Sequence, residues 1–142
     1  MKQRLALAFS SCLFVGFFPY APGTLASALA AAALYHLPGG AIYFIFPILL
    51  AGFLSTAVVL RHSKHIDPSY VVIDEWVGMW LSLAAMPKAA YSYIAAFIIF
   101  RIFDILKPWP ISLAEKAPGA LAVMLDDLAA GALTIVVMMY LF

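Results

Sequence analysis

The sequence predicts an all-α fold, a polytopic membrane bundle with about five spanning helices and a short N-terminal interfacial or re-entrant helix. Of the 142 residues, 66% are hydrophobic and only 11% are charged, whereas soluble domains are about half apolar and about a quarter charged. A soluble fold of this length cannot bury so much apolar surface. The apolar residues also fall into separate runs divided by short breaks. The length suits a single domain over residues 1–142.

The first apolar run, Leu5–Phe18, would reach only about 21 Å as a helix. This is short of the roughly 30 Å hydrocarbon core of a bilayer, so we expect an interfacial or re-entrant helix there. Lys2 and Arg4 precede the run in a pattern that resembles a secretory signal peptide. Cleavage to release a soluble domain is not expected, because the rest of the chain is equally hydrophobic.

The later apolar runs supply the predicted spans. A spanning helix needs about 20 apolar residues, and helices are favoured because backbone groups in lipid must satisfy their own hydrogen bonds. Leu25–Leu37 and Val71–Met86 are short, but each can gain a turn from flanking residues. The other three runs are long enough as they stand: Ala41–Leu60, Ala89–Leu106 and Leu121–Phe142.

The alternation of these spans gathers the charged residues on one membrane face. If the segment before Leu25 starts in the cytoplasm, the breaks at 61–69 and 107–119 are cytoplasmic and only Lys88 among the later basic residues lies outside. That distribution agrees with the positive-inside rule. Avoidance of the bilayer centre explains why acids lie at helix ends, but one face holds them all, which predicts a polar site there. These acids are Asp67, Asp74, Glu75, Asp104, Glu115, Asp126 and Asp127.

Three predicted helices contribute acids to this site. Asp74 and Glu75 enter one helix, Asp104 leaves the next, and Asp126 and Asp127 lie near the start of the last. Adjacent helical residues point about 100° apart, so each pair is expected to offer one inward carboxylate and one flanking partner. Converging carboxylates repel each other unless a cation bridges them, and hard oxygen ligands favour Mg²⁺, which often shares its coordination with substrate phosphate. The alternative is that each acid caps a helix or pairs with a neighbouring Lys or Arg.

Basic and hydroxyl groups nearby could bind an anion. Arg101, Asp104 and Lys107 are spaced along one helical stripe, which is typical either of a salt-bridge ladder or of a metal ligand flanked by two phosphate-binding cations. Thr24 and Ser27 lie at the start of another helix, where free amide hydrogens and hydroxyls bind phosphate. Thr24 could equally be a routine helix cap.

Other residues exclude several classes of function. The net charge of +1 and the absence of a basic run give no indication of nucleic-acid binding. One cysteine, Cys12, allows neither an internal disulfide nor a cysteine metal cluster, and its place in an apolar run favours packing. His62 and His65 could carry protons or be solvated loop residues. Two non-enzyme alternatives stay open, namely a small transporter or ion pathway that uses the same carboxylates and a structural membrane subunit.

Four segments resemble phosphatidylglycerophosphatase A, a family of bacterial inner-membrane lipid phosphatases. They occur in the family's order and span most of the chain. The segment around Arg101, Asp104 and Lys107 is the most specific. The four segments are Ala-Pro-Gly-Thr-Leu-Ala-Ser at 21–27, Val-Ile-Asp-Glu-Trp-Val-Gly-Met-Trp at 72–80, Phe-Arg-Ile-Phe-Asp-Ile-Leu-Lys-Pro-Trp-Pro-Ile at 100–111, and Met-Leu-Asp-Asp-Leu-Ala-Ala-Gly at 124–131.

The resemblance implies removal of the terminal phosphate from phosphatidylglycerophosphate, giving phosphatidylglycerol in phospholipid synthesis, with Mg²⁺ as cofactor. It also implies a multi-pass protein of the bacterial inner membrane with its site on the cytoplasmic face. The chain departs from the family at Ala26, Ala120 and Ala122, where glycine is usual, which puts in doubt only backbone contacts to phosphate. Matched by position, the family's polar residues are Thr24, Ser27, Asp74, Glu75, Arg101, Asp104, Lys107, Asp126 and Asp127.

Overall fold

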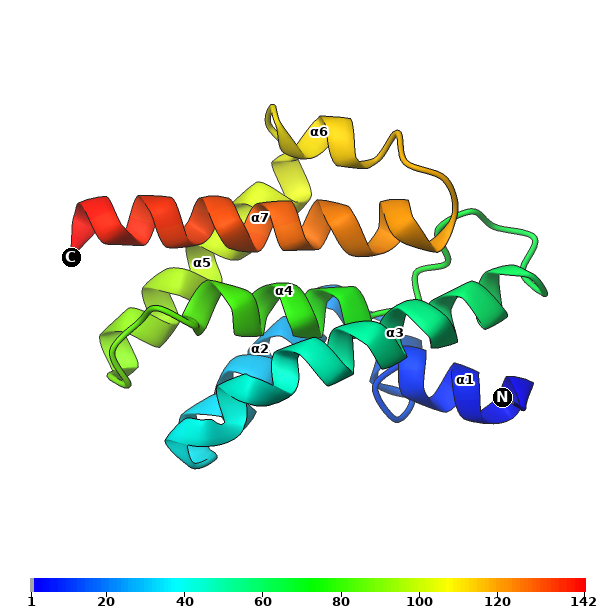
Figure 1. Ribbon diagram of the computed structural model, residues 1–142, viewed down its shortest axis with the longest axis horizontal. Helices are drawn as coiled ribbons and strands as arrows, with labels where there is room; N and C mark the ends of the chain where they lie inside the picture. The colour runs from blue at the N-terminus through cyan, green and yellow to red at the C-terminus, as the bar shows by residue number, and fades with distance from the viewer. Residues whose placement is uncertain (1) are drawn as a thin grey trace.

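The chain folds into a bundle of α-helices, as a computed structural model shows for residues 2–142 (Figure 1). No strand occurs within these residues, so the predicted all-α class is confirmed. Two short 3₁₀ segments, Val15–Phe17 and Gly39–Phe44, precede longer helices. The helices are α1 Gln3–Ser10, α2 Pro22–His36, α3 Ile45–Leu60, α4 Ile73–Leu83, α5 Ala90–Leu106, α6 Ile111–Ala114 and α7 Ala120–Leu141.

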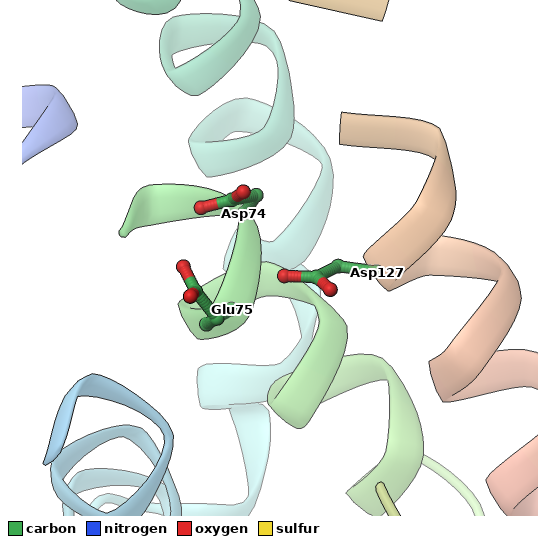
Figure 2. Close-up of side chains that lie close together, drawn as sticks. All are labelled: Asp74, Glu75 and Asp127. Carbon is green, nitrogen blue, oxygen red and sulfur yellow. The ribbon is translucent and has the colours of Figure 1, made fainter. Parts of the chain in front are cut away.

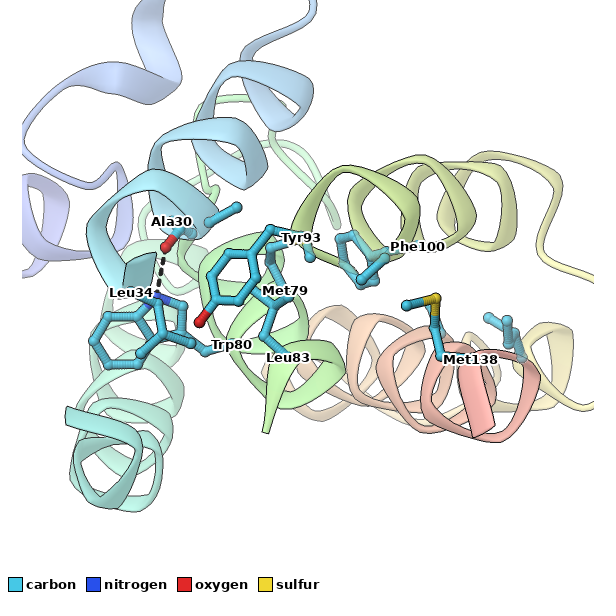
Figure 3. Packing of buried hydrophobic residues seen from close by; sticks show 12 residues of the cluster. Ala30, Leu34, Met79, Trp80, Leu83, Tyr93, Phe100 and Met138 are labelled. Atoms are coloured by element: carbon cyan, nitrogen blue, oxygen red, sulfur yellow. Dashed lines mark hydrogen bonds between the residues drawn. The ribbon is translucent and has the colours of Figure 1, made fainter. Parts of the chain in front are cut away.

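The short helix α4 forms the centre of the bundle. It contacts α2, α3, α5 and α7, and most of its residues are buried, as expected of a helix that is apolar on nearly every side. Met79, Trp80 and Leu83 pack against side chains of α2, α5 and α7 (Figure 3). The indole N–H of Trp80 donates a 2.8 Å hydrogen bond to the Ala30 carbonyl oxygen, which fixes α4 against α2.

The expected count of about five spans is not confirmed. Only Ile42–Leu60 and Ala120–Leu141 combine the length and hydropathy of a membrane-crossing helix within the described residues. Helix α4 was predicted as a span over Val71–Met86, but its 11 residues cover only about 16 Å. Its central position accounts for its apolar composition without contact with lipid, since a buried central helix is as apolar as a lipid-exposed one. Helices α2 and α5 have 15 and 17 residues.

The N-terminal apolar run is broken instead of forming one helix over Leu5–Phe18. Helix α1 ends at Ser10, and Cys12, Leu13 and Phe14 all have positive φ angles. The Phe14 N–H donates to the Ser11 hydroxyl at 3.1 Å, which stabilises this turn. Whether α1 lies in the membrane interface stays a prediction.

The broken N-terminal segment is attached to the start of α4. The Val72 N–H donates a 2.9 Å hydrogen bond to the Ser10 carbonyl oxygen. Gly16 lies against the Tyr70 carbonyl, where any side chain would collide with the backbone. Helix α1 and the start of α7 lie at one end of the bundle, and the C terminus lies at the other (Figure 1).

Candidate active site

A polar cavity of about 250 Å³ lies where α4 begins, α5 ends and α7 completes its second turn. The three elements come from separate parts of the sequence, and their contacts with one another place the acidic side chains together. The cavity is lined by backbone and side chains of Ala21, Pro22, Gly23, Asp67, Ser69, Val71, Asp74, Glu75, Arg101, Asp104, Lys107, Asp126 and Asp127. Seven of the nine residues predicted for the site line this cavity; Thr24 and Ser27 do not.

Three carboxylates form the innermost part of the site. Asp74 and Glu75 come from the first turn of α4 and Asp127 comes from α7, and one oxygen of each lies within 4.8 Å of the others (Figure 2). Asp127 is only 2% exposed. Three negative groups this close repel each other strongly in a buried setting. The cluster can therefore hold a metal ion.

Each carboxylate of this cluster has one oxygen without a hydrogen-bond partner in the described part of the chain, which supports the same interpretation. Asp74 Oδ1, Glu75 Oε2 and Asp127 Oδ2 are buried and have no hydrogen-bond partner within residues 2–142. A buried carboxylate oxygen without a partner is costly, so native proteins rarely leave several together. A cation of the hard, oxygen-binding class would satisfy all three.

The close crossing of α4 and α7 brings Asp127 to the other two acids. A Cβ atom at Gly78 would lie 2.8 Å from the Asp127 carbonyl oxygen, and one at Gly131 would lie 2.7 Å from the Gly78 carbonyl oxygen. Both distances are too short for a real side chain. The two glycines therefore allow the backbones to approach closely enough for the carboxylates to meet.

The first turn of α2 leaves room for Glu75. A Cβ atom at Gly23 would collide with the Glu75 carboxylate, so glycine is required there for the carboxylate to lie against the start of α2. The helix N-terminus also carries a partial positive charge, which favours a nearby anionic group. This explains how Glu75, which follows Asp74 directly, still reaches the site.

The two acidic pairs behave differently. One inward and one flanking carboxylate were expected from each pair, and α7 confirms this: Asp127 joins the cluster while Asp126 accepts a 2.7 Å hydrogen bond from Lys107 Nζ. In α4 the expectation is wrong, because Asp74 and Glu75 both enter the cluster. The longer Glu75 side chain and the space above Gly23 make this possible.

Arg101 and Lys107 face the acids from the end of α5. Arg101 forms an ion pair with Asp104 one turn later, and its Nη1 donates at 3.4 Å to the Ser27 hydroxyl. Lys107 pairs with Glu115 at 2.6 Å and with Asp126. Of the salt-bridge ladder considered as an alternative, the structure therefore contains only the Arg101–Asp104 pair, because Lys107 pairs with other acids. Lys107 follows the last helical residue with φ of 45°, so its side chain leaves the stripe.

Two groups at the rim of the cavity have shifted pKa values. Burial lowers the pKa of the Lys107 ammonium, but its hydrogen bonds to Asp126 and Glu115 outweigh this and raise the pKa above its usual range. Partial burial raises the pKa of the Asp67 carboxyl; Lys107 opposes the shift, and Asp104 and Glu115 add to it. Lys107 is therefore firmly cationic at neutral pH.

A protein-family model described as Phosphatidylglycerophosphatase A matches residues 8–142. The chain belongs to the phosphatidylglycerophosphatase A family. The resemblance seen in the sequence is thus confirmed, and the four segments that carried it supply most of the cavity wall. No solved structure matches the chain significantly.

Curated relatives agree with this family assignment. The Escherichia coli (strain K12) protein named Phosphatidylglycerophosphatase A is 34% identical over 137 residues, which cover 92% of this chain and 77% of the relative. The Haemophilus influenzae protein of the same name is 37% identical over 141 residues, covering 94% and 83%. A Bacteroides thetaiotaomicron protein named "Putative phosphatidylinositol-3-phosphatase" is 39% identical over 132 residues, covering 82% and 80%.

Thr24 and Ser27, the hydroxyl residues near the start of α2, were expected to bind phosphate, but neither lines the cavity. Ser27 is buried, and its hydroxyl donates to the Gly23 carbonyl oxygen at 2.8 Å while accepting from Arg101. Ala21 precedes the helix without a side-chain cap, so the alternative of Thr24 as the helix cap is wrong. Thr24 lies in the first turn, outside the cavity lining.

Three polar residues of the site were not predicted from the sequence. Asp67 and Ser69 line the cavity, and Glu115 binds Lys107. The sequence placed both acids on the same membrane face as the site, but they lie in breaks between helices. Because helical periodicity gives no orientation for such residues, only the folded loops place Asp67 at the cavity and Glu115 against Lys107.

Proposed function

We propose that this chain hydrolyses the terminal phosphate monoester of phosphatidylglycerophosphate, producing phosphatidylglycerol with Mg²⁺ as cofactor. The observation that carries the proposal is the convergence of three buried, unpartnered carboxylates on a cavity that also contains Arg101 and Lys107. Such a site suits a divalent cation and a phosphate group together. The family and the names of two relatives supply the substrate.

The metal ligands are proposed to be Asp74, Glu75 and Asp127, because one oxygen of each is close enough to the others to share one ion, and each carboxylate also has a buried oxygen without a partner among the described residues. When bound, Mg²⁺ would polarise the phosphoryl group and lower the pKa of a water molecule. Asp104 and Asp126 were also expected as metal ligands. Their ion pairs with Arg101 and Lys107 favour an orienting role, in which each acid holds a cation toward the cavity.

The phosphate oxygens are proposed to bind Arg101 and Lys107. Arg101 Nε is buried and has no acceptor among the described residues, so this N–H can donate to an incoming oxygen. Lys107 lies between two carboxylates and keeps its charge. Ser27 then acts through Arg101 by limiting the positions of the guanidinium group. The role of Thr24 as a phosphate ligand stays a prediction.

We further propose that the site end of the bundle faces the cytoplasm in a bacterial inner membrane. Helix α7 and the stretch Ile42–Leu60, which contains α3, have the length and hydropathy to cross the bilayer. Arg61 and Lys64 follow α3, and Lys107 and Lys116 lie between α5 and α7, so positive charge gathers at the end where the site lies, in accordance with the positive-inside rule. A lipid of that membrane could then place its headgroup in the cavity without leaving the membrane.

Phosphate release from the purified, detergent-solubilised chain tests the proposal. Phosphatidylglycerophosphate should release inorganic phosphate in Mg²⁺, and chelation should stop the release. Phosphatidylinositol-3-phosphate belongs in the same assay because of the Bacteroides relative's name, and its preferential hydrolysis would replace the proposed substrate. No release from either lipid, with or without Mg²⁺, would reject the enzyme proposal and favour the transport or structural alternatives.

A further inference from the structure

We propose that an apolar groove between α1, α2, α3 and α4 holds one acyl chain of the lipid whose phosphate enters the site. This inference rests on the proposed function, because it assigns a part of the substrate to a second region. The groove has a volume of about 310 Å³, and no charged side chain lines it. Its lining residues are Ala8, Phe9, Cys12, Leu13, Ala33, Leu37, Ile48, Ile73, Trp76 and Trp80.

The first turn of α4 contributes residues both to the groove and to the carboxylate cluster. Ile73 lines the groove, and the next two residues of the same helical turn, Asp74 and Glu75, belong to the cluster. Cys12 lines the groove from the other side, and its thiol is 3.8 Å from the Val72 carbonyl oxygen. Burial and the nearby negative charge of Glu75 raise the pKa of Cys12 to about 12. Residues of a single helical turn therefore contribute to both the apolar groove and the carboxylate cluster.

One wall of the groove is rigid and one is open. Ile73, Trp76 and Trp80 share a face of α4, and Trp80 is fixed by its hydrogen bond to Ala30 of α2 (Figure 3). The small side chain of Ala33 leaves space opposite that face. Leu13, which is 81% exposed, lies where the groove meets the surroundings.

An acyl chain suits this groove better than a polar ligand or a peptide. The lining offers hydrophobic contact and almost no hydrogen-bonding surface, whereas a peptide backbone would need partners for its own polar groups. A phosphorylated lipid needs a charged pocket for its phosphate and an apolar groove within reach of it, and the first turn of α4 contributes to both. The acyl chain enters from surrounding lipid and not from water, so the gain in affinity comes from packing contacts with the groove rather than from the hydrophobic effect.

Fluorescence quenching can detect the acyl chain directly. Of the three tryptophans, Trp76 and Trp80 line the groove and Trp109 does not. In the Trp109→Phe variant, both remaining tryptophans therefore report on the groove by their fluorescence. A non-hydrolysable phosphonate analogue of phosphatidylglycerophosphate with brominated acyl chains should quench their emission saturably. Brominated phosphatidylcholine, which lacks the phosphate monoester, should quench less at the same mole fraction. Equal quenching by both lipids would overturn the assignment, because it would indicate contact with any surrounding lipid.

Two neighbouring alanines of α2 provide a matched pair of variants. Ala33 lines this groove, whereas Ala32 lines a separate apolar groove between α2 and α5. In the Trp109→Phe background, Ala33→Leu should abolish the selective quenching and raise KM for a dipalmitoyl substrate by more than about threefold, because the larger side chain fills the space that the acyl chain would occupy. Ala33→Val should show a smaller effect in the same direction. Ala32→Leu should change both quantities by less than about twofold.

The outcomes separate this inference from the proposed function. Equal losses in the Ala33 and Ala32 variants, or no loss in either, would reject the groove, provided that circular dichroism shows native helix content. Selective quenching without phosphate release from the wild type would reject the proposed enzyme activity and retain the lipid groove. Phosphate release without selective quenching would retain the enzyme and reject the groove.

Discussion

At the scale of single residues, position within a pair of acids does not determine the role of each acid. Asp126 and Asp127 are neighbours, yet one is paired with Lys107 and the other is buried without a partner for Oδ2. An acid whose charge is already matched gains little from a cation, whereas an unmatched buried acid needs one. The free carboxylate oxygens therefore separate proposed metal ligands from orienting residues.

Asp127→Asn should therefore have a larger effect than Asp126→Asn. Loss of a ligand in the cluster should lower metal affinity and phosphate release by more than about a hundredfold, because loss of outer-shell partners alone costs about 10- to 100-fold. Asp126→Asn should stay within that smaller range and act mainly through Lys107. Titration of Mg²⁺ in the phosphate-release assay measures both quantities. A larger loss in Asp126→Asn would contradict the assignment.

Gly23→Ala should weaken metal binding without unfolding the protein. The new methyl group would displace the end of the flexible Glu75 side chain rather than backbone, so the expected stability change is small. Removal of one carboxylate from its position should raise the Mg²⁺ dissociation constant about 10- to 100-fold. Isothermal titration gives the affinity, and thermal unfolding in chelator gives the stability. Unchanged affinity would show that Glu75 is not a ligand.

At the scale of elements, the crossing of α4 and α7 determines the geometry of the site. In the sequence, both helices are apolar segments that contain a glycine. A glycine inside a helix lowers the intrinsic stability of that helix by about 1 kcal/mol relative to alanine. Here Gly78 and Gly131 lie where the two backbones meet. The close approach outweighs the propensity cost, because it brings the acid of α7 to the acids of α4.

Gly78→Ala should destabilise the bundle and disrupt the site together. Its Cβ atom would lie 2.8 Å from the Asp127 carbonyl oxygen and 2.9 Å from the Phe100 ring. Overpacking of this kind costs about 1–3 kcal/mol, so Tm should fall and Mg²⁺ affinity should decrease. Gly39→Ala is the matched control, because a Cβ atom there has no neighbour within 4 Å. Equal Tm values for the two variants in detergent would contradict the proposed crossing constraint.

At the scale of the whole molecule, the fold gathers charge at one end and covers a short central helix with longer ones. Helix α4 contributes two acids and no exposed polar face, while α2, α3, α5 and α7 surround it. The concentration of unmatched negative charge at its start opposes the compact state through self-repulsion. A bound cation would remove that repulsion and connect α4 to α7.

Mg²⁺ should consequently stabilise the folded protein. A ligand that binds only the native state adds about 2.7 kcal/mol of stability at a hundred times its dissociation constant. Thermal unfolding in detergent should show a higher Tm in Mg²⁺ than in chelator, and Asp127→Asn should remove most of the difference. An equal Tm rise in wild type and Asp127→Asn would place the stabilising ion elsewhere.

The amino-acid sequence by itself determined the helical class, the breaks between the later helices, the family and most of the polar residues at the cavity. These follow from local properties: hydrophobic composition, Pro-Gly breaks and ordered motifs. Tertiary structure alone decided that α4 is a buried core helix and that Glu75 enters the cluster. It also decided that Lys107 leaves the Arg101 stripe and that Asp67 and Glu115 join the site. The physical reason is that burial and pairing depend on which backbones approach each other, and residues such as Gly23, Gly78 and Gly131 set that approach only when their distant partners are in place.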